Sequence, residues 1–212
     1  VQDCPHLLLE PQRTNYHKFH DFRSESNFQN ASKNAHTTEV LSPANDNTAC
    51  KVITQVKSSD GVSAISAKTP AGYIHNHTAN TDYVGSVFAK KGTFDWIALV
   101  LGNAGFPEPT VYFNISTGEV GTEESDATGF IEDFGNGWYR CSMKYNLGTR
   151  SDLSGRVLFR FADADGHQIV PRKGKEHMYL WGAQVEEGSY PTSRIQTSVA
   201  AETISAALCN GA

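Results

Sequence analysis

The sequence has no long apolar run and no cluster of basic residues. Its 212 residues include 18 lysines and arginines against 23 aspartates and glutamates, a net charge of −5, which does not indicate a surface for nucleic-acid phosphates. A membrane helix needs roughly 20 consecutive apolar residues, and no run approaches that length. Val1 is followed by polar residues and not by an apolar leader. We therefore expect a soluble chain without a nucleic-acid or membrane partner, which either lost a leader or begins as a fragment.

The sequence also lacks the short motifs of common catalytic sites. It contains no nucleophile elbow, no glycine-rich phosphate loop and no zinc-binding helix motif. Adjacent acidic residues such as Glu132 and Asp133 would point to opposite faces of a strand, so they could not flank one glycosidic bond. An enzyme is therefore not predicted. A polysaccharide lyase that uses tyrosine, histidine, arginine or lysine on a concave surface stays open as an alternative.

Cysteine is scarce, with four residues in the chain. Four cysteines allow three pairings, which sequence alone does not separate. Cys4 and Cys209 lie near the chain ends, which compact domains often bring together, while Cys50 and Cys141 lie in strand-like segments. We predict disulfides between Cys4 and Cys209 and between Cys50 and Cys141. Free buried thiols, in a protein assembled in a reducing cytoplasm, are the alternative.

Alternation of apolar and polar side chains is strongest over residues 138–145, after a turn signal at 135–137. This period of two is typical of a half-buried strand. On its core face we place Tyr139, Cys141, Met143 and Tyr145. Residues 178–188 form a second strand of this kind, and on its core face we place Tyr179, Trp181, Ala183 and Val185.

Further strand-like segments recur at the roughly 8 to 12 residue spacing of a sandwich or barrel. They are residues 7–9, 49–56, 61–67, 81–89, 94–101, 111–116, 127–134 and 157–161. Residues 94–101 are apolar on both faces, which favours a central strand with Trp96 in the core. Only residues 200–208 are helix-like. We predict a single all-β domain over residues 1–212, an antiparallel two-sheet sandwich. Residues 12–38 would form a long irregular arm held by aromatic side chains, and residues 191–212 a C-terminal tail.

Four segments, in order along the chain, resemble a family of jelly-roll domains found mainly in virion proteins of tailed phages and related to bacterial carbohydrate-binding modules. They are Leu7–Asn15, Val111–Gly118 followed by Val120–Thr122, Gly135–Ser142 and Leu180–Ser193. The resemblance implies a two-sheet jelly roll attached to virion fibres, head decorations or polysaccharide-degrading enzymes. It implies no defined reaction.

From this resemblance we expect a non-enzymatic virion component, such as a fibre or decoration protein, on the virion surface or outside the cell. The arm at 16–28 and the tail after Pro191 would contact other virion subunits in a homo-oligomer, and the domain could attach to surface glycans. The alternative is a secreted carbohydrate-binding module of a polysaccharide-degrading enzyme.

Sugar binding requires exposed aromatic rings, which stack on the C–H face of a sugar, beside polar groups that bind its hydroxyls. Trp138 and Arg140 fall on the outward face of their strand and are the first candidates. Tyr112 and Asn114, on the polar face of a predicted hairpin, would extend the site. The alternative is structural, with Trp138 covering the sandwich edge and Arg140 paired with an acid such as Asp133.

Oxygen ligands at the first and last predicted strands suggest a calcium site. Glu10, Gln184 and Glu186 would approach one another if these strands pair as the jelly-roll topology implies, and hard oxygen ligands suit calcium. The alternative is a set of solvated charges at the rim. No other cofactor is predicted.

Overall fold

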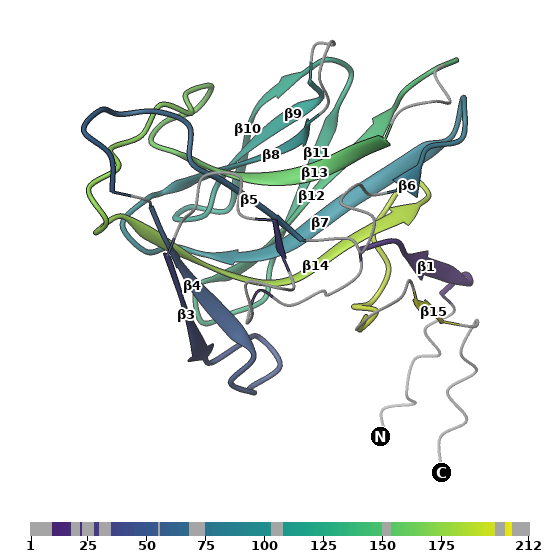
Figure 1. The fold of residues 1–212 in the computed structure, drawn as a ribbon. Helices are drawn as coiled ribbons and strands as arrows, with labels where there is room; N and C mark the ends of the chain where they lie inside the picture. Colours follow the sequence, from purple (N-terminus) through teal and green to yellow (C-terminus); the bar gives the residue numbers. More distant parts are fainter. Residues whose placement is uncertain are drawn as a thin grey trace.

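The computed structural model describes residues 10–17, 22, 28–29, 35–54, 56–67, 75–102, 108–149, 154–197 and 202–204. Within these ranges the chain forms fifteen strands and no helix. These ranges therefore contain no helix that could cross a membrane. Thirteen of these strands form two antiparallel sheets that pack face to face (Figure 1). The predicted all-β two-sheet sandwich is confirmed.

The first sheet has the strand order β10-β9-β8-β13-β5-β2, with β6 (His75–Asn76) also paired to β13. Its strands are β10 (Glu119–Glu124), β9 (Thr110–Asn114), β8 (Trp96–Gly102), β13 (Ser154–Ala162), β5 (Ala64–Ala67) and β2 (Phe28–Gln29). The predicted central strand is β8, which pairs with both β9 and β13 and is buried on both faces over most of its length.

The second sheet has the order β11-β12-β7-β14-β4-β3. Its strands are β11 (Thr128–Asp133), β12 (Trp138–Asn146), β7 (Asp82–Lys90), β14 (His177–Glu187), β4 (Ala49–Ile53) and β3 (Ala35–Val40). From β7 onward the chain alternates between the sheets, because β7, β11, β12 and β14 lie in the second and β8 to β10 and β13 in the first. This alternation is the jelly-roll arrangement.

The main core lies between the two sheets. It contains the predicted inward residues of β12, Cys141, Met143 and Tyr145, with Tyr139 packed at its edge. Opposite them, β8 and β13 contribute buried aliphatic and aromatic residues such as Leu99. The predicted face of β12 is therefore confirmed. Trp96 does not enter this core, because it lies half-buried against a smaller cluster of apolar side chains that includes Tyr112 and Leu158.

The predicted face of β14 is wrong at Tyr179 and Trp181. Pairing between β14 and β7 shifts register between Trp181 and Gln184, and Gly182 at that point has a φ of +62°. A bulge inserts one residue and reverses the face of the side chains beyond it. Ala183 and Val185 therefore face the main core, whereas Trp181 is buried on the opposite face of the sheet and Tyr179 packs against the same outer cluster.

The described residues at the two chain ends are more regular than predicted. Within the expected irregular arm lie β1 (Arg13–Asn15), β2 and the start of β3. In the expected tail, β15 (Glu202–Ile204) is a strand and not part of a helix, and it pairs with β1 in a separate two-stranded sheet (Figure 1). The strand predicted at Leu7–Leu9 lies outside the described residues.

The predicted disulfide between Cys50 and Cys141 is not formed, since both residues are buried free thiols. Cys50 is in β4 and Cys141 in β12, which are three strand positions apart in the second sheet. At about 4.8 Å per position the separation is roughly 14 Å, about twice the Cα–Cα limit for a disulfide. Burial also raises the pKa of the Cys141 thiol well above its ordinary value, so the thiol stays protonated. Cys4 and Cys209 lie outside the described residues.

Candidate functional site

A row of four side chains crosses the outer face of the second sheet. Glu132 of β11 is in register with Arg140 of β12, Arg140 with Phe88 of β7, and Phe88 with Trp181 of β14. Side chains that are opposite one another in register lie on the same face of a sheet. The row therefore presents an anion, a cation and two aromatic rings side by side.

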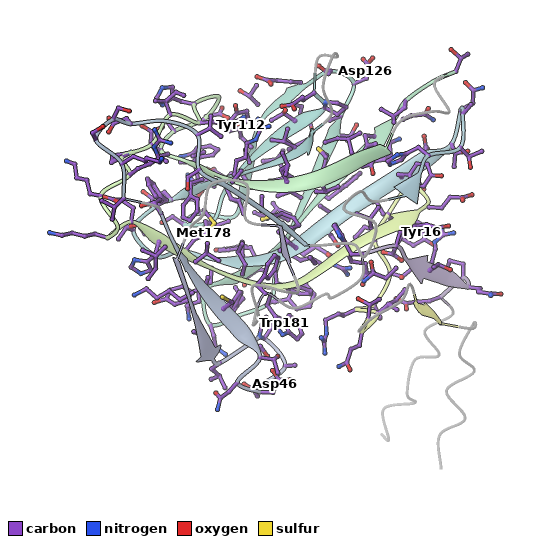
Figure 2. The ribbon with its side chains drawn as sticks, viewed as in Figure 1. Tyr16, Asp46, Tyr112, Asp126, Met178 and Trp181 are labelled. Atoms are coloured by element: carbon purple, nitrogen blue, oxygen red, sulfur yellow. The ribbon has the colours of Figure 1, made fainter. Side chains whose placement is uncertain are left out.

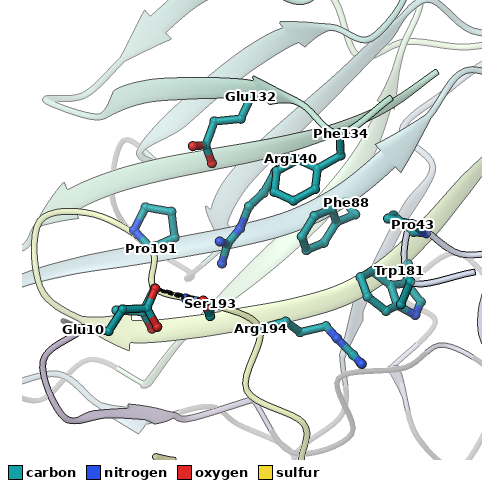
Figure 3. Close-up of a pocket in the computed structure, with 12 residues that line it drawn as sticks. Glu10, Pro43, Phe88, Glu132, Phe134, Arg140, Trp181, Pro191, Ser193 and Arg194 are labelled. Atoms are coloured by element: carbon teal, nitrogen blue, oxygen red, sulfur yellow. Dashed lines mark hydrogen bonds between the residues drawn. The ribbon is translucent and has the colours of Figure 1, made fainter. Parts of the chain in front are cut away.

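This row forms the floor of a pocket of about 380 Å³, within the size range of small-molecule sites. Two loop segments and one residue before β1 complete the wall (Figure 3). The lining residues are Glu10, Pro43, Ala44, Phe88, Glu132, Phe134, Arg140, Trp181, Pro191, Thr192, Ser193 and Arg194.

Arg140 is the most unusual residue of the pocket. Arg140 is 5% exposed, yet among the described residues its hydrogen-bond partner is Ser86, whose Oγ accepts a 3.3 Å bond from Nη2. Among the described residues its Nε has no hydrogen-bond partner, and Arg140 makes no ion pair with any of them. Burial lowers the pKa of Arg140, and the nearby charges of Glu186, Glu132 and Glu10 partly offset that effect.

A buried cation is normally paired or fully hydrogen-bonded, because an unused buried donor costs about 1–3 kcal/mol. The Arg140 guanidinium instead lies 5.3 Å from the centre of the Phe88 ring, at the wall of the pocket (Figure 3). The predicted alternative, an ion pair between Arg140 and Asp133, is not formed in the described part of the chain.

Aromatic rings form one side of the pocket. Phe134 and Phe88 meet edge to face with ring centres 4.8 Å apart, and Phe88 and Trp181 do so at 5.0 Å. Phe134 is 47% exposed, whereas Trp181 is 4% exposed. The Trp181 Nε1 donates a 2.7 Å hydrogen bond to Thr48 Oγ1, and the Arg194 guanidinium covers the Trp181 ring at 4.0 Å. Phe134 is therefore the ring that is open to a ligand.

Residues 191–195, which we name the strap, form the wall on the side of β14. The Thr192 amide and hydroxyl both donate to the Glu186 carboxylate, and the Ile195 amide donates to Gln184 Oε1 at 2.8 Å. The Ser193 amide and hydroxyl donate to Glu10 Oε1, each at 2.9 Å. These bonds fix the strap over the sheet.

The three predicted calcium ligands are therefore brought to one place, where they bind the strap. Glu10, Gln184 and Glu186 all accept hydrogen bonds from its backbone amides, and Gln184 also donates to Glu186. Within the described ranges, no group of three or more histidine, cysteine, aspartate or glutamate side chains is arranged to hold a metal ion. Calcium binding there stays a prediction without structural support.

The predicted sugar-binding residues are not brought together in one site. Trp138 is buried in a cluster with Ala49, Phe88 and Trp181, so it supports the pocket floor and does not line the pocket. Tyr112 lies on the other sheet, far from Trp181 (Figure 2), and its hydroxyl accepts a hydrogen bond from Gln168.

Asn114 also belongs to the other sheet and has a structural role. Its Oδ1 accepts hydrogen bonds from the amides of Ser116 and Thr117 at 2.9 and 3.2 Å, which is an Asx-type turn. Of the four predicted residues, only Arg140 lines the pocket.

Sequence reasoning missed Glu132, Phe134 and Phe88 as pocket residues. A usable signal was present, since Glu132 and Phe134 are two residues apart and so share a face of the predicted strand at 127–134. The register that sets this face beside Arg140 is a property of the folded sheet. Arg194 reaches the pocket through the strap, which the sequence did not predict.

Comparison with known proteins gives little further information. No family model matches the sequence, and no curated protein matches it. Among solved structures, the chain is similar to the CBM22-2 xylan-binding domain from Paenibacillus barcinonensis Xyn10C. The two are 9% identical, the TM-score is 0.46, and the similarity covers 83% of this chain and 98% of that chain.

Proposed function

We propose that this protein is a non-catalytic carbohydrate-binding domain that holds a sugar in the pocket on the outer face of the second sheet. The observation that carries the proposal is Arg140, a buried cation that lines the pocket and that, among the described residues, makes one hydrogen bond, from Nη2 to Ser86, and no ion pair. A sugar hydroxyl or ring oxygen in the pocket would accept a further hydrogen bond from the guanidinium.

The other pocket residues complement the remaining chemistry of a sugar. Phe134 is exposed enough to stack on the C–H face of a pyranose ring, in the way that aromatic rings contact apolar surfaces. Glu132, in register with Arg140, can accept hydrogen bonds from hydroxyl groups. Donor, acceptor and ring together provide the three contacts that a polyhydroxylated ligand needs.

The composition of the pocket supports binding without catalysis. Among the described residues its lining has no tyrosine, histidine, lysine or cysteine, which often act as bases or nucleophiles. Its two hydroxyl side chains, Thr192 and Ser193, donate hydrogen bonds to Glu186 and Glu10. Of its two carboxylates, that of Glu10 accepts two hydrogen bonds from Ser193 of the strap. Incubation of the protein with polysaccharides should release no unsaturated or reducing ends.

We propose further that the domain belongs to a virion fibre or decoration protein, as the resemblance of the sequence to tailed-phage jelly rolls suggests. It would then assemble with other copies on the virion surface and attach to a host glycan. The alternative is a secreted module of a polysaccharide-degrading enzyme. Recovery of the chain in repeated copies from purified particles would favour the first, and its absence from particles the second.

Glycan binding is tested by screening the protein on a glycan array and measuring the affinity of each hit by calorimetry. Phe134→Ala should weaken binding about 3- to 10-fold, because a lost aromatic contact is worth about 0.5–1.5 kcal/mol. Phe130→Ala is the matched control, since Phe130 is 41% exposed on the same edge strand but does not line the pocket. Equal affinities of the two variants would contradict the proposed site.

A further inference from the structure

Charge is unevenly distributed along the chain. Residues 92–139 contain eight aspartates and glutamates but no lysine or arginine, although the net charge of the whole chain is −5. The rest of the chain is therefore positive. Of the eight acids, Asp95 pairs with Lys91 and Glu108 with Arg160. The other six are exposed and form no ion pair within the described part of the chain.

These six acids lie where the edges of the two sheets meet. β10 is an edge strand of the first sheet and β11 of the second, and a 2.6 Å hydrogen bond from the Gly129 amide to Glu123 Oε1 joins them. Edge strands are the usual place where another chain associates with a sheet. Apolar side chains are exposed between the acids. We name this surface, without the residues that line the pocket, the acidic edge; it contains Glu119, Val120, Glu123, Glu124, Asp126, Phe130 and Asp133.

The opposite charge is displayed by two loops, residues 56–62 and 169–175, which we name the loop pair. Backbone hydrogen bonds join them, from the Lys57 amide to the Arg172 carbonyl and in both directions between Gly61 and Val170. The loop pair has one acid, Asp60, and four cations, which are Lys57, Arg172, Lys173 and Lys175. It also exposes three large apolar side chains, Val56, Val62 and Ile169, of which Val56 is 72% exposed. Exposed apolar groups gathered on one surface indicate an interaction site.

The two surfaces lie on different sides of the sandwich. The loop pair connects β4 to β5 and β13 to β14. Within the sheets, β13 and β14 are three strand positions from β10 and β11, and β5 and β4 are four positions away. At about 4.8 Å per position, this separates the surfaces by roughly 14–19 Å. Figure 2 likewise shows Asp126 of the acidic edge far from Met178, which follows the loop pair. The two surfaces can therefore contact different molecules.

We propose that the acidic edge of one copy docks on the loop pair of a second copy. Opposite charges set the orientation of such a contact, and the apolar side chains exposed on both surfaces are buried together. Because the contact joins two different surfaces, it is heterologous and can continue from copy to copy into a ring or a filament. This inference rests on the proposed assembly of the domain with other copies, and it names the surfaces that carry that assembly.

Analytical ultracentrifugation of the purified chain over a range of concentrations tests the contact. At about 0.1 M salt the average mass should rise with protein concentration. Raising the salt to about 1 M shortens the Debye length from about 10 Å to about 3 Å, which should weaken the association at least about tenfold. A chain that stays monomeric at up to about 1 mM would overturn the inference. The acids would then serve only to protect the sheet edges from aggregation.

Charge reversal identifies the two surfaces. The edge variant Glu119→Lys/Glu124→Lys and the loop variant Lys173→Glu/Lys175→Glu should each associate at least about tenfold more weakly, because attraction becomes repulsion. The edge variant changes the net charge from −5 to −1, so the general repulsion between copies falls while the association is lost. An equal mixture of the two variants should associate again, as should a single chain with all four substitutions, which has the original net charge. Association that survives either reversal, or that neither combination restores, would overturn the inference.

Melting curves and glycan affinity are the independent readouts. The four substituted residues are exposed and do not line the pocket, so every variant should keep the Tm and the glycan Kd of the unmodified chain. A monomeric chain that binds glycan would overturn this inference and leave the carbohydrate-binding function intact. A chain that associates as expected but binds no glycan would refute that function and leave the contact between copies intact.

Discussion

Replacing Gly182 with alanine perturbs the bulge that turns Trp181 toward the pocket. Gly182 has a φ of +62°, in the left-handed region that costs a residue with a Cβ about 1–2 kcal/mol. A Cβ at this position would also lie 3.0 Å from Arg194 Cδ and 3.1 Å from Phe88 Cδ2. This crowding is added to the backbone strain. Both neighbours also line the pocket.

Gly148 provides the matched control for this substitution. Its φ of +60° is nearly the same, but a Cβ there would meet no atom within 4 Å. Gly148→Ala should therefore lose only the backbone term, about 1 kcal/mol. Gly182→Ala should lose roughly 2–4 kcal/mol, because overpacking adds about 1–3 kcal/mol. The gain from a stiffer unfolded chain is common to both variants and cancels in the comparison.

Urea unfolding of the two variants and the wild type gives these free energies of unfolding. For a chain of this size, each kcal/mol also corresponds to about 2–4 °C in Tm, so the two melting curves should separate by several degrees. Gly182→Ala should in addition weaken glycan binding, since Phe88 and Arg194 must move. Equal destabilisation by both substitutions would refute the packing argument for the bulge.

Two further predictions concern the segment around β1. His17 is fully buried and burial lowers its pKa to about 4, so the folded state holds it neutral while the unfolded chain binds a proton near pH 6.5. The free energy of unfolding should therefore be fully retained above about pH 6.5 and fall by up to about 3 kcal/mol as the pH drops toward 4. Denaturant titrations at several pH values should show that this fall is smaller in His17→Phe. An equal fall in the variant would contradict the assignment of the pH dependence to His17. Asn15 accepts hydrogen bonds from the amides of His17 and Val185, both 3.0 Å, and donates to the Ile195 carbonyl, so Asn15→Ala should cost roughly 2–4 kcal/mol in urea unfolding. A loss below about 1 kcal/mol would show that water replaces these bonds.

The strands that follow uninterrupted alternation could be predicted from the sequence. β12 has no bulge in its pairing with β7, so Cys141 and Met143 face the core as expected. The face predicted for β14 was wrong because a single added residue reverses the face of the side chains beyond it. The glycine at position 182 was the available signal, since glycine inside a strand pattern often marks a bulge.

The candidate site could be predicted only in part, because its parts come from distant positions in the sequence. The outward face of Arg140 followed from local alternation. Which sheet a strand joins does not follow from local pattern, so Tyr112 was grouped with Arg140 although β9 and β12 belong to different sheets. The proximity of Glu10 to Glu186 was anticipated, but their partners in the strap depend on how residues 191–195 fold back.

The most direct test of the account is a crystal structure of the protein soaked with the glycan that binds best in the array. We predict density for a sugar stacked on Phe134, with an oxygen within hydrogen-bond distance of the Arg140 guanidinium and a hydroxyl at Glu132. A sugar bound instead on the outer face of the first sheet, near Tyr112 and Asn114, would contradict the assignment of this pocket.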